Sequence, residues 1–137
     1  MIYLDTSVAL AWLLTEDREP PGSFWDGTLV SSRLLEYEIW TPLHARGLAD
    51  SHGEAARRLV GRIALLELTP RVLARALDAF PGPAPPRTLD ALHLASCAYL
   101  VDQGQEVELA SYDRRMNDVA RAMDIPLFDP EMPHFRA

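Results

Sequence analysis

The sequence predicts one α/β domain built on a buried parallel β-sheet. Short apolar segments rich in β-forming residues alternate with longer helical segments along the chain, an order typical of parallel sheets covered by helices. The 137 residues correspond to about one domain, and 48% of them are hydrophobic, which suffices for one filled core. We therefore treat residues 1–137 as a single domain.

The first elements are a strand and a helix. The segment IYLD, residues 2–5, predicts a strand, and the Ala- and Leu-rich residues 6–16 predict a helix entered through Thr6 or Ser7. Residues 16–27 contain turn formers and two adjacent prolines, so they predict a loop.

A second strand and helix follow this loop. The segment TLVSS, residues 28–32, predicts a strand, and residues 33–47 predict a helix with Ser32 as its N-cap and Gly47 as its end. Pro42 lies inside this helix. Because proline has no N–H to donate, we expect it to bend or interrupt the helix.

The middle of the chain adds a third strand between two helices. Residues 52–67 predict a helix with Gly61 as its weak point, residues 66–69 a short strand, and residues 70–80 a helix that begins with proline. Residues 81–87 hold four prolines and a glycine, which predicts an extended or turning loop.

The C-terminal part repeats the alternation. Residues 88–104 predict a long, mostly apolar helix, residues 107–111 a strand, residues 112–123 a helix and residues 125–128 a last strand. Connections between parallel strands of one sheet are right-handed, so we expect right-handed crossovers here.

Composition excludes several classes of protein. The net charge of −7 argues against nucleic-acid binding by bulk electrostatics, but leaves local recognition open. The single cysteine, Cys97, cannot form an internal disulfide, and four scattered histidines do not form a structural zinc pattern. No stretch reaches the roughly 18 apolar residues of a membrane span, and the N-terminus lacks the basic region of a secretion signal. We therefore expect a cytoplasmic protein.

Some acidic residues lie where carboxylates are unusual. Asp5 ends a strand, and ligands of open α/β sheets bind outside the carboxyl ends of strands. Asp113 repeats this placement after the fourth strand. Capping of the following helix is the alternative for both residues, and it is the stronger alternative for Asp113.

Two further acids lie among apolar helical neighbours. At about 100° per residue, Glu38 falls inside an apolar arc, whereas Glu36 falls at its edge, where an ion pair with Arg33 explains it. We favour Glu38 and keep Glu36 as the fallback. Asp90 projects between apolar residues of its helix, where an unpaired carboxylate is costly, although it could instead interact with the N–H groups at the helix start. His93 is expected to be a packed or hydrogen-bonding histidine and not a ligand.

Together, these acids predict a metal site. If Asp5, Glu38, Asp90 and Asp113 converge at one sheet edge, their repulsion requires cations. Oxygen ligands select Mg²⁺ or Mn²⁺, and paired divalent ions can support phosphodiester cleavage by an activated water. The sequence has no motif of the nucleotide-binding, hydrolase-triad or zincin classes.

Four segments resemble PIN-domain ribonucleases, in particular the VapC-type toxins of bacterial toxin-antitoxin pairs. These segments are MIYLDTS, VSSRLLEYEIW, RTLDALHLA and ASYDRRM. The resemblance implies the family's four acids at Asp5, Glu38, Asp90 and Asp113. It also implies a five-stranded parallel sheet with helices on both faces, and metal-dependent RNA cleavage.

The resemblance implies partners as well. It implies a homodimer and a small VapB-type antitoxin that inserts a basic side chain among the acids. RNA would be held by bound metal and by arginines, either Arg87, Arg114 and Arg115 or the cluster of Arg57, Arg58 and Arg62. Hydroxyl groups that support the acids are implied at Thr6 or Ser7 and at Ser111.

Two other functions fit the sequence less well than a metal-dependent ribonuclease. A phosphotransfer fold, such as a receiver domain or a haloacid-dehalogenase-like phosphatase, typically needs a lysine late in the chain, and this chain has no lysine. The other is a non-catalytic, PIN-like protein-binding module. The four mutually repelling acids argue against it, because a module without chemistry does not need them.

Overall fold

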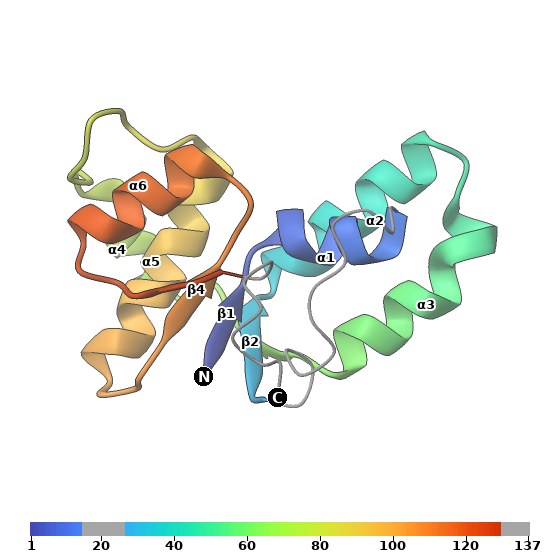
Figure 1. The fold of residues 1–137 in the computed structure, drawn as a ribbon, viewed down its shortest axis with the longest axis horizontal. Coiled ribbons are helices and arrows are strands. Elements are labelled where there is room, and N and C mark those ends of the chain that lie inside the picture. Colours follow the sequence, from blue (N-terminus) through green and yellow to red (C-terminus); the bar gives the residue numbers. More distant parts are fainter. Residues whose placement is uncertain (15–26, 130–137) are drawn as a thin grey trace.

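The computed structural model describes residues 1–14 and 27–129 and shows the predicted α/β architecture (Figure 1). In the described residues, five parallel strands form one sheet in the order β3-β2-β1-β4-β5. The strands are β1 (Ile2–Leu4), β2 (Leu29–Ser32), β3 (Ala64–Leu66), β4 (Glu108–Ala110) and β5 (Leu127–Phe128).

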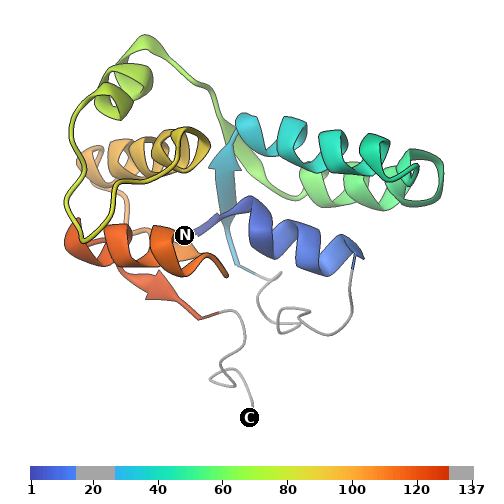
Figure 2. The ribbon, with the colours of Figure 1, turned by 90° about the horizontal axis from the view of Figure 1, so that it is seen from above.

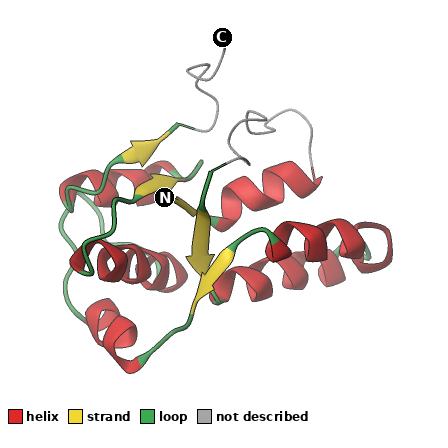
Figure 3. Ribbon diagram, turned by 90° about the horizontal axis from the view of Figure 1, so that it is seen from below, coloured by secondary structure: helices red, strands yellow, loops and turns green. Residues whose placement is uncertain are grey.

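Helices cover both faces of this sheet. They are α1 (Thr6–Leu14), α2 (Leu34–Ala45), α3 (Ala49–Gly61), α4 (Pro70–Leu77), α5 (Thr88–Asp102) and α6 (Arg114–Ala122). Figures 2 and 3 show α1, α2 and α3 on one side of the strands and α4, α5 and α6 on the other. The loop expected at residues 16–27 lies outside the described residues, apart from Gly27.

The central strand divides the core into two parts. Leu4 packs into a cluster with residues of α1, α2 and α3. Its neighbour Tyr3 packs into a second cluster with residues of α5 and α6. Successive side chains of a strand point to opposite faces, so β1 contributes to both clusters and is fully covered.

The third strand differs from its prediction. The expected helix over 52–67 and strand over 66–69 are wrong: α3 begins at Ala49 and ends at Gly61, and β3 spans Ala64–Leu66. An apolar run such as Ile63–Leu66 fits a buried strand as well as a helix. In the structure, this run pairs with β2, and Val30 lies opposite Ala64. Gly61 is the last residue of α3, and glycine favours the end of a helix because it stabilises helices poorly.

The second helix is continuous through its proline. We expected Pro42 to bend or interrupt this helix, and the structure shows no interruption. Proline removes only the N–H that would bond to the Glu38 carbonyl, four residues earlier. The helix end is as predicted, because Gly47 has a left-handed φ of 67° and the N–H of Leu48 donates to the Leu43 carbonyl at 2.7 Å.

Candidate active site

The four predicted acids line one cavity at the carboxyl ends of β1 and β4. The cavity measures about 520 Å³, and its carboxylates belong to Asp5, Glu38, Asp90 and Asp113. Strand order reverses at this place, because the chain leaves β1 for β2 on one side and returns to β4 on the other. Such a switch point is where open α/β sheets bind ligands.

The fallback residue, Glu36, points away from this cavity. Its carboxylate forms an ion pair of 2.5 Å with Arg33, and it does not line the cavity. Arg33 also pairs with Glu67 at 2.8 Å. The ion pair proposed for Glu36 is therefore confirmed, and Glu38 is the acid that α2 contributes.

Hydroxyl groups hold Asp5 in place. Its side chain is buried, and Ser7 Oγ and Ser111 Oγ donate to Oδ2 at 2.7 and 2.8 Å. Ser7 Oγ also accepts from the N–H of Tyr112 at 3.0 Å. The described hydrogen bonds of this carboxylate thus come from hydroxyls of α1 and of the segment after β4, which fix it between two strands.

A buried polar chain holds Glu38. Thr6 Oγ1 donates to Glu38 Oε1 at 2.8 Å, and His93 Nε2 lies 2.5 Å from the same oxygen. A carboxylate can only accept, so Nε2 carries the proton. The other ring nitrogen, Nδ1, lies 2.8 Å from the hydroxyl of Tyr3. His93 is a hydrogen-bonding histidine, as predicted.

Charge in the cavity raises the pKa of His93. Burial alone would lower this pKa, but the hydrogen bond with Glu38 and the charges of Asp5, Glu38 and Asp90 raise it above 6.5. The imidazole therefore responds to the negative potential of the cavity as well as to its contact with Glu38.

Arg87 bridges the remaining two acids. Its Nη2 lies 3.0 Å from Asp113 Oδ2, and its Nε lies 3.4 Å from Asp90 Oδ2. The other oxygen of Asp113 accepts from the N–H of Met116 at 3.1 Å, so the capping role considered for Asp113 is real. Burial and the charges of Asp113 and Asp5 raise the pKa of Asp90 in spite of Arg87.

The donor set fits a hard divalent cation. Every candidate ligand is a carboxylate or hydroxyl oxygen, the type that Mg²⁺ and Mn²⁺ prefer. Burial, and then the charges of Asp113 and Asp5, make the ionised form of Asp90 less favourable and raise its pKa, a cost that a bound cation would offset. In the described residues, no three acidic, histidine or cysteine side chains are close enough together to form a ready metal site. Asp5, Glu38, Asp90 and Asp113 are the residues of the cavity that would hold a cation.

Sequence analysis gave little weight to three residues in or around this site. Arg87 had a local signal, because it precedes Asp90 by three residues and such pairs meet on a helix. Tyr3 carried a weaker one, since a buried tyrosine needs a partner for its hydroxyl. Tyr37 lines the cavity and precedes Glu38 in the chain, but the spacing of residues in the sequence does not predict that an aromatic side chain is exposed.

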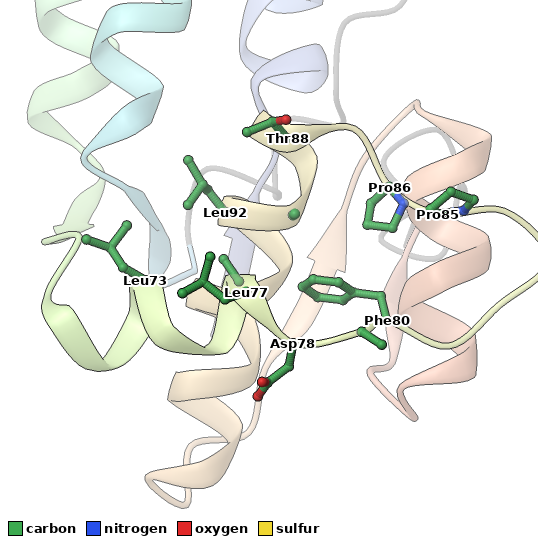
Figure 4. A pocket seen from close by; sticks show the side chains of 11 residues that line it. Leu73, Leu77, Asp78, Phe80, Pro85, Pro86, Thr88 and Leu92 are labelled. Carbon is green, nitrogen blue, oxygen red and sulfur yellow. The ribbon is translucent and has the colours of Figure 1, made fainter.

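A second cavity lacks comparable chemistry. It lies between α4 and α5, measures about 450 Å³ and is lined by apolar residues such as Leu77, Phe80 and Leu92 (Figure 4). Asp78 is the one charged residue among the described residues that line it. The carboxylate cavity is therefore the candidate active site.

Comparison with known proteins shows which family the chain resembles. The chain is 27% identical over 135 residues to the protein named Ribonuclease VapC35 from two strains of Mycobacterium tuberculosis, CDC 1551 / Oshkosh and ATCC 25618 / H37Rv. Each alignment covers 95% of this chain and 97% of the relative. Across the described part of the chain, no helix has the length and apolar character needed to span a membrane. The PIN domain family model matches residues 2–122, so the chain belongs to the PIN domain family.

Proposed function

We propose that this protein is a Mg²⁺-dependent endoribonuclease and the toxin of a VapBC-type toxin-antitoxin pair, with Mn²⁺ as a substitute metal. The observation that carries the proposal is the meeting of Asp5, Glu38, Asp90 and Asp113 in one cavity of a PIN domain. The ribonuclease name of the VapC35 relatives supports RNA as the substrate.

The metal would be held by the four carboxylates. When bound, Mg²⁺ would lower the pKa of a coordinated water and neutralise charge that develops on the phosphodiester. The chain's own residues orient the ligands: Ser7 and Ser111 fix Asp5, and Thr6 and His93 fix Glu38. Hydrogen bonds of this kind orient carboxylates that act as metal ligands.

Arg87 has a second role in this proposal. Its guanidinium contacts both Asp90 and Asp113, two of the acids that line the cavity, and its side chain is 67% exposed. With the charge of the acids neutralised, the exposed guanidinium of Arg87 would be able to bind a phosphate oxygen of RNA. Arg87 thus supplies positive charge on a protein whose net charge is −7.

The proposal includes partners. The negative charge of the protein favours an antitoxin segment rich in basic residues, which would compete with Arg87 for the carboxylates. We further propose a homodimer that acts in the cytoplasm, where RNA substrates are present. Size-exclusion chromatography with light scattering tests the dimer directly.

RNA cleavage is the experiment that tests the function. Purified protein is incubated with total bacterial RNA in the presence of Mg²⁺ or Mn²⁺, with EDTA, and beside the Asp90→Asn variant. We expect discrete products that disappear with EDTA and in the variant. Unchanged RNA in every lane, from folded protein free of antitoxin, would favour the alternative of a non-catalytic binding module.

A further inference from the structure

The candidate active site has an apolar wall as well as its carboxylates. The wall consists of Leu10, Leu34, Tyr37, Pro42 and Leu89. Metal binding accounts for the acids, but it gives no reason for an aliphatic and aromatic surface beside them. The wall therefore offers an apolar surface, directly beside the acids, to a molecule that binds in the cavity.

Helix α2 presents both kinds of residue on one face. Leu34, Tyr37 and Glu38 follow the spacing that brings helix residues to one side, and Pro42 continues it one turn later. The core is filled from the other side of the helix by residues that are fully buried, namely Leu35, Ile39 and Leu43. Tyr37 is thus a cavity residue that the core does not use.

Two side chains of the wall are exposed, which is unusual for large apolar residues. Tyr37 is 66% exposed and Leu89 is 46% exposed. They come from α2 and from the start of α5, so they flank the cavity from two elements that are far apart in the sequence. A flat ligand could contact the tyrosine ring while its attached phosphate lies toward Glu38 and Asp90.

We propose that the apolar wall is a subsite for one unpaired nucleobase of the RNA, stacked on Tyr37 beside the phosphodiester to be cleaved. This inference rests on the proposed function. A nucleobase is flat and apolar on its faces, and aromatic side chains are the usual platforms for unpaired bases. A base inside a duplex is already stacked on both faces, so the subsite selects single-stranded RNA.

Binding measurements test the subsite without cleavage. The probe is a fluorescently labelled single-stranded RNA of about ten nucleotides that spans a cleavage site found in the total-RNA experiment. Its anisotropy is measured with Ca²⁺ in place of Mg²⁺ and with Asp90→Asn as the background, so that the RNA stays intact. Removal of one stacking platform, Tyr37→Ala, should weaken binding by roughly 5- to 150-fold, whereas Tyr37→Phe and Tyr37→Trp should bind like the parent.

A matched control removes exposed apolar surface elsewhere. Leu77 is 89% exposed and lines the second cavity (Figure 4). Leu77→Ala should leave RNA affinity unchanged, and the same RNA annealed to its complement should bind equally weakly to all variants. Circular dichroism would check that Tyr37→Ala keeps the fold.

Each outcome separates this proposal from the function on which it rests. Tyr37→Ala with parental affinity and parental KM overturns the base subsite, while metal-dependent cleavage by the wild type still upholds the nuclease. Equal losses in Tyr37→Ala and Tyr37→Phe would overturn stacking, because the hydroxyl would then make the contact. Failure of the wild type to cleave any RNA would refute the function itself. A variant that loses affinity for a protein partner and not for RNA would show a protein-binding wall.

Discussion

Tyr3→Phe tests the buried polar chain behind Glu38. The substitution removes one hydroxyl and keeps the ring, so the apolar packing around the ring is preserved. The ring at position 3 can keep its edge-on contact with the His93 ring, whose centroid lies 5.8 Å away at an interplanar angle of 81°. What is lost is the partner of His93 Nδ1 at 2.8 Å.

The cost follows from burial. Tyr3 and His93 are both 0% exposed, so water cannot replace the hydroxyl. A buried polar group left without a partner costs about 1–3 kcal/mol. We expect the free energy of unfolding to fall by that amount, which corresponds to a lower Tm by about 4 °C for each kcal/mol in a chain of this size.

Urea denaturation in EDTA measures this change, with Tyr37→Phe as the matched control. That control makes the same chemical change on a side chain that is 66% exposed, and surface substitutions usually stay within about 0.5 kcal/mol. Equal stability of Tyr3→Phe and Tyr37→Phe would refute the reasoning, because His93 would then not depend on Tyr3.

Three further predictions concern charge, burial and backbone conformation. Asp90→Asn should stabilise the metal-free protein at neutral pH by up to about 1 kcal/mol, since this carboxylate is partly solvated. Because folding raises the pKa of Asp90 above 3.8, the unfolded state ionises first as pH rises, and the gain should shrink as pH falls toward 3. Urea titrations at pH 3 and pH 7 check this, and an equal gain from Asp118→Asn would contradict it. Burial raises the pKa of the Cys97 thiol to about 12, so the free energy of unfolding should fall as pH rises from about 9. Dithionitrobenzoate at pH 8 should react with Cys97 only as fast as the protein unfolds, and immediate labelling of native protein would show that the thiol is accessible. Gly47→Ala should destabilise by about 1 kcal/mol because its φ is 67°, whereas Gly61→Ala, with open space around the new methyl group, should stabilise by about 0.5–1 kcal/mol; thermal melts that rank them the other way would refute both.

Most of the fold could be predicted because its signals are local. Apolar spacing predicted the helix that corresponds to α2, whose Leu35, Ile39 and Leu43 are fully buried, and Gly47 identified its end. The third strand could not be placed in the same way. Its apolar run suits either secondary structure, and pairing with β2 decides between them.

The candidate site was predictable where an acid stands out among apolar neighbours. Helical projection placed Glu38 inside the apolar arc of its helix, and the structure shows Glu38 lining the cavity beside Leu34 and Pro42. The support of Glu38 could not be predicted, because Tyr3 and His93 meet across 90 residues of sequence and no local pattern records such a contact.

The central position of β1 bears on how the protein is synthesised. β1 is made first and can pair with β2 early, but its other edge has no partner until β4 has been made, about a hundred residues later. Asp5 and Glu38 precede the proline-rich residues 81–87, and Asp90 and Asp113 follow them. A nascent chain, or a fragment cut at those prolines, holds only half of the acids. The candidate site can therefore form only when both halves of the chain have joined one sheet, so it stays incomplete until synthesis is nearly finished.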